Sequence, residues 1–257
     1  MLVQERQNEI LNMLMQHGGI LKMTELARRF DVSNETIRRD LEYLQDQKLI
    51  QRVYGGAILL DKQNTSARAI YSLGKTAGQK ERAAIGRAMA SMIQEGESLF
   101  LSTGTTVLEV AKHLKHLKNL TIMTNSLPVV HELASTDFTI YVVGGKLSNT
   151  EMSTYGEMAL DSLRNIYVDR TIIGAGGITL EHGISDFHDA DFTLRNEMRR
   201  RTNQLVVVCQ SDKFGRNAFA IRNSLDVVDM IVTDSKIDPK YHGELMARNI
   251  KLITADV

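Results

Sequence analysis

The stretch Asp31–Leu44, with the sequence DVSNETIRRDLEYL, decides the fold of the first part of the chain. Ser33 can cap the start of a helix, because its hydroxyl can accept a backbone N–H of the first turn. The apolar side chains that follow recur at i, i+4 and i+7 and form one narrow stripe: Ile37, Leu41 and Leu44. The pattern therefore predicts a capped amphipathic helix.

The opposite face of this helix carries groups that suit DNA. At about 100° per residue, the exposed face of its first two turns holds Glu35, Thr36, Arg38 and Arg39. A hydroxyl, two guanidinium groups and a carboxylate can contact phosphates and base edges in a major groove. Glu42 and Asp46 lie further along this face and would repel phosphates, so we expect only the N-terminal half of the helix to enter the groove. Taken alone, the same pattern also describes a solvated surface helix.

The flanking sequence favours the DNA-binding interpretation. Residues 2–16 and 24–30 each have a helical pattern, and residues 31–33 form a tight turn before the next helix. Residues 49–59 have the pattern of two short strands, with Gly55-Gly56 supplying the positive φ of a hairpin turn. A helix, a helix-turn-helix and a hairpin in this order predict a winged-helix DNA-binding module.

We expect the DNA contacts of this module on its second helix, its third helix and its wing. The expected residues are Arg28, Ser33, Asn34, Glu35, Thr36, Arg38, Arg39, Arg52 and Tyr54. Within this set, Glu35, Arg38 and Arg39 are expected nearest the bases. The residues expected nearer the phosphates are Arg28, Thr36 and Arg52.

The module resembles the DeoR-type winged helix of bacterial sugar-metabolism regulators. The motifs that carry the resemblance are Leu26-Ala27, Val32-Ser33, Thr36–Leu41 and Tyr54–Ala57. One position departs from the family pattern: Lys22 stands where the family often has Ser or Thr before its second helix, and lysine cannot cap a helix N-terminus. The resemblance implies operator DNA as the partner of this module.

The composition of the whole chain limits its class. With 257 residues, 43% of them hydrophobic, the chain can form one large and one small core. Its net charge is zero, and residues 1–56 hold eight basic and eight acidic residues, so the basic groups must act by their placement. The single Cys209 excludes an intrachain disulfide and a cysteine-based zinc site, and fits a reducing compartment. We expect a cytoplasmic protein without a signal peptide or membrane span.

The second part of the chain alternates strand and helix signals. Strand-like runs lie at residues 98–102, 120–124, 138–143, 170–174, 205–209, 230–233 and 251–253, with helical runs between most of them. This alternation predicts a mostly parallel, Rossmann-like α/β sheet covered on both faces. We expect a winged helix-turn-helix domain at residues 1–58, a polar linker at 59–75 and an α/β domain at 76–257.

Polar stretches follow several of these predicted strands, and ligands of such sheets bind at the carboxyl ends of the strands. The stretches are Ser102–Thr106, Thr124–Ser126, Gly174–Ile178, and Asp191 and Arg195 with Lys213. The first has hydroxyls, small residues and a helix N-terminus, which suit a phosphate, and Asn125 can bond a sugar hydroxyl. Each stretch alone also fits a helix cap, a tight turn or a surface i,i+4 ion pair. Together they favour a site for an anion and a polyol.

Residues 76–253 resemble the sugar-phosphate-sensing domain of the same family, which is similar in fold to ribose-5-phosphate isomerase. The matching motifs are Gly104–Thr106, Thr124-Asn125, Gly144-Gly145, Gly174-Ala175, Gly177-Ile178, Met198 and Lys213–Gly215. The chain departs from the family at Ser102-Thr103, commonly Asp-Ser, at Asp191 and Arg195, usually Glu and Lys, and at residues 209–213. The expected effector-binding residues are Ser102, Thr103, Gly104, Thr105, Thr106, Asn125, Gly145, Gly176, Asp191, Arg195 and Lys213.

Two other functions are weighed against this one. A sugar-phosphate isomerase or deaminase with a DNA-binding appendage would need a carboxylate beside C1 and C2 of its substrate. The resembling enzymes place an Asp where this chain has Gly176, and Ser102 replaces the acid of the first loop. The remaining candidate acids and bases lack a diagnostic spacing: Glu181, Asp186, Asp189, His182 and His188. A purely architectural DNA-binding protein would leave the α/β half without a purpose.

The sequence therefore predicts a bacterial transcription regulator, a repressor of a carbohydrate-utilisation operon, and not an enzyme. The expected partners are operator DNA, a phosphorylated sugar or sugar alcohol, and further copies of the chain in a dimer or tetramer. We expect no cofactor, no metal and no membrane partner. In this hypothesis Thr103–Thr106 hold the phosphate, Lys213 or Arg195 neutralises it, and Asn125 and Asp191 bond hydroxyls.

Overall fold

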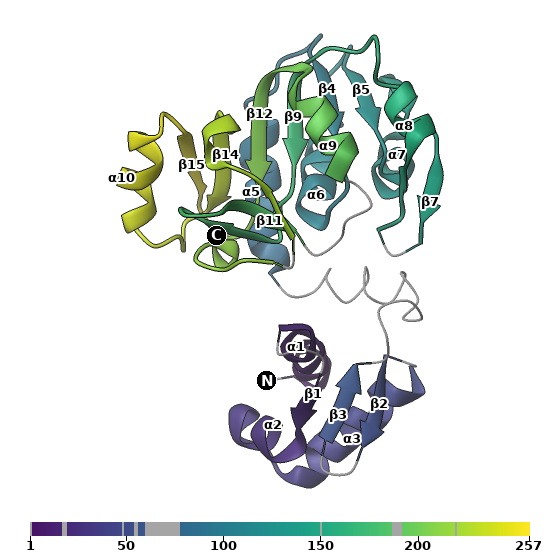
Figure 1. Cartoon of the computed structure of the whole chain (residues 1–257). Coiled ribbons are helices and arrows are strands. Elements are labelled where there is room, and N and C mark those ends of the chain that lie inside the picture. Colours follow the sequence, from purple (N-terminus) through teal and green to yellow (C-terminus); the bar gives the residue numbers. More distant parts are fainter. Residues whose placement is uncertain are drawn as a thin grey trace. The chain divides into compact units, whose positions relative to one another are not determined.

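A computed structural model describes most of the chain. The described residues are 2–16, 20–47, 49–53, 56–59, 78–149, 151–186, 192–218 and 220–257. Two compact units, Met1–Ala77 and Gly78–Val257, divide the chain between them, and each is described by itself (Figure 1). Nearly all of the expected linker lies outside the described residues.

The first unit is a winged helix, as the sequence predicts. Its elements are α1 (Val3–Gln16), β1 (Ile20–Lys22), α2 (Met23–Phe30), α3 (Asn34–Asp46), β2 (Ile50–Val53) and β3 (Gly56–Leu59). The strands form one sheet in the order β1-β3-β2, and both pairings are antiparallel. The predicted stripe of α3 lies at 0–1% exposure in a core that also includes Ile10, Leu14 and Leu26. Strand β1 was not predicted, because three residues are too few to show a period.

The sequence places Gly56 in the hairpin turn, but the structure places it in β3. Gly56 lies opposite Lys22 of β1 and Val53 of β2. A Cβ at Gly56 would lie 2.2 Å from the carbonyl oxygen of Leu21. The glycine is therefore required by the close approach of β1 to β3 and not by a turn. Its neighbour Gly55 lies outside the described residues.

The second unit is built on a parallel sheet of seven strands. In spatial order they are β15 (Lys251–Ala255), β14 (Met230–Asp234), β12 (Thr202–Val208), β9 (Val168–Ile173), β4 (Ser98–Leu101), β5 (Thr121–Thr124) and β6 (Thr139–Val142). All neighbouring pairs in this sheet are parallel. The predicted parallel α/β fold is therefore confirmed.

Helices cover both faces of this sheet (Figure 1). They are α5 (Gln79–Ala90), α6 (Thr105–Leu114), α7 (Leu127–Leu133), α8 (Glu157–Asp161), α9 (Phe192–Arg199) and α10 (Lys240–Ala247). On one face, α9 contacts β9 and β12, and its Leu194 and Met198 share one hydrophobic cluster with Phe100 of β4. On the other, α5 lies beside α6.

Two small antiparallel sheets lie outside the main sheet and were not predicted. One is the hairpin of β7 (Lys146–Ser148) and β8 (Ser153–Tyr155), and the other joins β10 (Gly177–Thr179), β11 (Gly183–Asp186) and β13 (Ala220–Asn223). Each of these strands has only three or four residues, too few for alternation to distinguish a strand from a loop. Each of the two sheets contributes contacts to the carboxyl edge of the main sheet.

Candidate nucleic-acid interface and candidate effector site

Helix α3 begins with the cap that the sequence predicts. Ser33 has extended backbone angles, and its Oγ accepts the backbone N–H of Thr36 at 3.1 Å. The two hydroxyl groups of Ser33 and Thr36 also bond each other at 2.9 Å. The cap therefore fixes both hydroxyls at the N-terminal end of α3, where they were expected to meet DNA.

A buried ion pair fixes α3 against α1. Asp40 is 2% exposed, and its carboxylate accepts bonds from Arg6 Nε at 2.6 Å, Arg6 Nη2 at 3.2 Å and Gln7 Nε2 at 3.1 Å. Sequence reasoning missed this pair, because its members are 34 positions apart. One signal was present: Asp40 falls between Ile37 and Leu41 on the apolar side of α3, where a carboxylate needs a partner.

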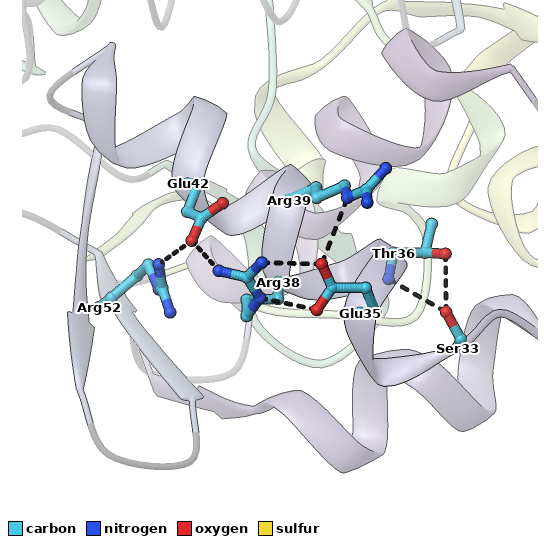
Figure 2. A network of polar contacts seen from close by, with 7 residues as sticks. All are labelled: Ser33, Glu35, Thr36, Arg38, Arg39, Glu42 and Arg52. Carbon is cyan, nitrogen blue, oxygen red and sulfur yellow. Dashed lines mark hydrogen bonds and ion pairs between the residues drawn. The ribbon is translucent and has the colours of Figure 1, made fainter.

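The exposed face of α3 carries a network of charges that extends to the wing (Figure 2). Arg38 binds both carboxylate oxygens of Glu35, with Nε–Oε2 at 2.8 Å and Nη2–Oε1 at 2.7 Å, while Arg39 Nε lies 3.3 Å from Oε1. Arg38 also pairs with Glu42, whose Oε1 accepts Arg52 Nη1 at 2.8 Å. The hydrogen bond from Arg38 lowers the pKa of Glu35 to about 2, and the bond to Glu35 raises the pKa of Arg38.

The residues expected to contact DNA are exposed or half-buried wherever the structure describes them. Exposed residues of this set are Arg28, Ser33, Asn34, Glu35, Arg38 and Arg39, and half-buried ones are Thr36 and Arg52. The side chain of Arg39 is 75% exposed, against 44% for that of Arg38. Arg39 therefore gives up fewer contacts within the protein than Arg38 does when its side chain turns towards DNA. Tyr54 lies outside the described residues.

In the second unit, the predicted polar stretches follow neighbouring parallel strands. Ser102–Thr106 follow β4, Asn125 follows β5, Gly174–Gly177 follow β9, and residues 211–213 follow β12. Because β5, β4, β9 and β12 are adjacent in that order, these loops share one edge of the sheet. The position expected for a ligand site in such a sheet is therefore the position that these residues occupy.

The loop after β4 leads directly into α6. Gly104 has φ 136°, and α6 begins at Thr105. The first N–H groups of a helix have no partner within the helix, and its dipole favours an anion there. Thr103 is 1% exposed and donates its hydroxyl to the carbonyl of Glu151, between β7 and β8, at 3.1 Å. Gly104 and Thr105 are half-buried.

A guanidinium group lies at this loop. Arg195 of α9 donates from Nε to Ser102 Oγ at 3.0 Å and from Nη1 to Asp186 Oδ2 of β11 at 2.6 Å. Its side chain is 12% exposed. Asp191, its expected neighbour on the helix, lies outside the described residues. The structure thus brings Ser102 and Arg195 together from 93 positions apart and adds Asp186, which was not among the expected effector contacts.

The other expected effector residues have structural partners of their own. Asn125 is fully buried and donates from Nδ2 to the carbonyl of Thr154 in β8 at 3.1 Å. Gly176 N–H donates to the carbonyl of Ser185 in β11 at 2.9 Å. Lys213 Nζ forms an ion pair with Asp212 at 3.0 Å.

The glycines of these loops allow close approach of protein backbone. Gly145 has φ 129°, and a Cβ there would lie 2.5 Å from the carbonyl oxygen of Tyr155. A Cβ at Gly177 would lie 2.4 Å from the carbonyl oxygen of Arg216. At Gly177 the glycine is therefore required by the close approach of one backbone segment to another.

The candidates for enzyme chemistry that the structure describes lie in two pairs. Asp186 is paired with Arg195, and Oε1 of the exposed Glu181 lies 3.7 Å from Nε2 of His182, whose Nδ1 lies 3.3 Å from Asn217 Nδ2. Asp189 and His188 lie outside the described residues.

Within the described ranges, no group of three or more His, Cys, Asp or Glu residues could hold a metal ion. Among those same residues, no helix has the length and apolarity needed to cross a membrane.

Two family models match the chain, one on each unit. The DeoR-like helix-turn-helix domain matches residues 6–63, and the DeoR C-terminal sensor domain matches residues 77–235. The chain belongs to the DeoR family. This DeoR-family chain is a DNA-binding transcription regulator.

Characterised relatives align over almost the whole DeoR-family chain. It is 34% identical to the transcriptional repressor AccR of Agrobacterium fabrum over 90% of each chain. It is 33% identical to the transcriptional repressor GlcR of Bacillus subtilis, over 97% of this chain and 95% of that one. It is also 33% identical to the glycerol-3-phosphate regulon repressor of Escherichia coli over 90% of each chain.

Solved structures resemble the chain more distantly. Ribose-5-phosphate isomerase A of Methanocaldococcus jannaschii matches 54% of this chain and 55% of its own at 13% identity, with a TM-score of 0.41. The sorbitol operon regulator SorC of Klebsiella pneumoniae matches 82% of this chain and 89% of its own at 8% identity, with a TM-score of 0.34.

Proposed function

We propose that this regulator represses an operon for carbohydrate utilisation and responds to a phosphorylated sugar or sugar alcohol. The names of three relatives, each a repressor, support the direction of control. The contact between Arg195 and Ser102 carries the proposal for the effector. It holds a guanidinium group beside a loop that opens a helix, and these are the two features that bind a phosphate.

The operator is read by the first half of α3. Glu35, Arg38 and Arg39 reach base edges, and Arg28 and Arg52 contact phosphates on either side. The cap at Ser33 and the buried pair of Asp40 and Arg6 set the position of α3 on the first unit.

The effector lies at the carboxyl edge of the second unit. Its phosphate meets the N–H groups at the start of α6, with Thr105 and Thr106 adding hydroxyls and Arg195 adding charge. Asn125, Asp191 and Lys213 contact the remainder of the molecule. The chain acts there as a sensor and not as an enzyme, and the ion pair that holds Asp186 to Arg195 at 2.6 Å supports this assignment.

We infer that occupancy of this edge shifts the first turn of α5. Helix α5 follows the segment that joins the two units, and Arg82 in its first turn donates to Gln210, which follows β12, at 3.1 Å. Lys236 after β14 pairs with Glu81 of the same turn at 2.5 Å. In a homo-oligomer, a shift of this turn would alter the spacing of the recognition helices. Two half-sites on one face of DNA need a spacing of about 34 Å or a multiple of it.

A binding titration tests this proposal. Labelled DNA from upstream of the gene and its neighbours is titrated with the full chain, with and without a panel of sugar phosphates, at two salt concentrations. The proposal expects one specific complex that a member of the panel dissolves. A specific complex that is indifferent to every member would refute the effector assignment, and turnover of a member would refute the non-enzyme assignment.

A further inference from the structure

Glu42 connects the recognition helix to the wing. Its Oε1 accepts Arg52 Nη1 of β2 at 2.8 Å, and the same oxygen pairs with Arg38 Nη1, one turn earlier on α3 (Figure 2). A second contact places the wing strand, because Gln45 Oε1 accepts the backbone N–H of Arg52 at 3.0 Å. Arg52 is therefore held near Glu42 by its backbone as well as by its charge.

The five charged groups of this surface nearly cancel. Arg38, Arg39 and Arg52 contribute +3, and Glu35 and Glu42 contribute −2, so the sum is +1. Attraction to DNA phosphates does not depend on base sequence, and it grows with each guanidinium group that can reach a phosphate. A carboxylate shared by two arginines reduces this attraction for both of them.

Holding Arg38 does not prevent it from reading bases. A guanidinium group has five N–H donors. Three N–H donors of Arg38, one each on Nε, Nη1 and Nη2, bond carboxylates. The other two N–H donors, one on Nη1 and one on Nη2, remain for DNA, and the three bonds fix the direction in which they point. A side chain that is already oriented loses less entropy when it meets its matching base edge.

We propose that Glu42 raises the specificity of DNA binding, by restraining Arg52 and, together with Glu35, Arg38 from phosphate contacts on non-operator DNA. On an operator, the restrained Arg38 fits its base edge and brings the wing into position for Arg52 to meet a phosphate. On any other sequence, the two arginines stay partly neutralised. Glu42 acts through the arginines and is a positioning residue. The proposal rests on the assignment of α3 and the wing as the DNA-binding surface.

The test compares Glu42→Gln with Asp46→Asn in the full chain. Asp46 is an exposed acid one turn further along α3, and the ion pairs of Arg38, Arg39 and Arg52 are with Glu35 and Glu42, so Asp46→Asn controls for the loss of one negative charge. Each variant is titrated with the upstream fragment that the wild type binds and with a shuffled duplex of equal length, over a series of salt concentrations. Circular dichroism checks that each variant is folded.

Glu42→Gln should tighten binding to the shuffled duplex about tenfold at low salt and steepen the slope of log K against log[salt] by about 1 to 2, since each new phosphate contact adds about 0.9. Operator binding should change less, so the specificity ratio falls. In an Arg52→Gln background the effect of Glu42→Gln should shrink, because one of the released groups is missing.

The outcomes separate the proposal from its premise. Equal effects of Glu42→Gln and Asp46→Asn on the shuffled duplex would overturn the role of Glu42, as would an effect that Arg52→Gln and Arg38→Gln leave unchanged. A wild-type chain that binds no fragment specifically would instead overturn the assignment of the DNA-binding surface itself.

Discussion

The two units assemble their polar groups in different ways. In the first unit, the outward charges lie on one helix and on the strand that follows it, between Glu35 and Arg52. In the second, Ser102 of the loop after β4 meets Arg195 of α9 from 93 positions apart, and Arg195 also holds Asp186 of β11. A surface made by one helix can be read from its period, whereas a site made by converging loops exists only once the sheet has formed.

The buried pair of Arg6 and Asp40 in the first unit is the exception to this contrast, because its members are far apart in the sequence. Breaking this pair should have the largest effect on stability. Asp40→Ala leaves the charge of Arg6 buried and unpaired, which costs about 3 to 5 kcal/mol. We expect the first unit to unfold at a lower denaturant concentration, while the unfolding of the second unit is unchanged. Hydrogen exchange, followed separately for the amides of each unit, measures this difference. Asp46→Ala on the exposed face is the control. Equal protection in both variants would mean that the buried pair does not hold α3.

Arg39→Ala tests whether the exposed face reads bases. We expect operator binding to fall by roughly 10- to 100-fold and binding to shuffled DNA to fall much less. Arg28→Ala should weaken both about equally and reduce the salt slope by about 1, as loss of a phosphate contact does. Titrations of both variants on both duplexes make the comparison. Equal losses on the two duplexes for Arg39→Ala would assign that residue to phosphate alone.

Arg195→Gln tests the converging site in the second unit. Removing its charge from the loop after β4 should weaken the response to the effector by roughly 10-fold or more and leave operator affinity in the absence of effector unchanged. Arg200→Gln, at an arginine just beyond α9 whose side chain is 70% exposed, is the matched control. The readout is the effector concentration that halves the operator complex. If the two variants respond alike, Arg195 has no part in the site.

The pH dependence of the first unit should show the smallest effect. The pKa of Glu35 is lowered to about 2 by Arg38, so the stabilisation from this contact is present above its ordinary pKa near 4.5. It is lost as the pH falls from about 4.5 towards 2. Comparison of acid unfolding of the wild type and Glu35→Gln isolates this share, because the variant lacks it. Identical acid transitions would show that the contact adds nothing to stability.

Much of the fold could be predicted, because long elements carry their period in the sequence. The stripe of α3, the cap at Ser33 and the parallel sheet follow from local patterns. What was missed is non-local or short. The pair of Arg6 and Asp40, the contact of Arg195 with Ser102, and strand β1 leave no periodic trace.

The misreading of Gly56 has the same origin. A glycine beside another glycine between two strands is typical of a turn, and the pattern gives no sign that a third strand passes close to it. The Leu21 carbonyl, contributed by β1, is what excludes a Cβ there. Of the candidate sites, the sequence could therefore name residue types and strand ends, but not which side chains meet.

Hydrogen–deuterium exchange of one sample under two conditions tests most directly whether the first unit binds DNA and the second unit binds the effector. The full chain is measured with its upstream DNA and, separately, with a sugar phosphate that dissolves the complex. The account predicts that DNA protects the amides of α3 and β2, and that the sugar phosphate protects residues 102–108 and the segment around Arg195. Protection of α3 by the sugar phosphate in the absence of DNA, with no change at residues 102–108, would contradict it.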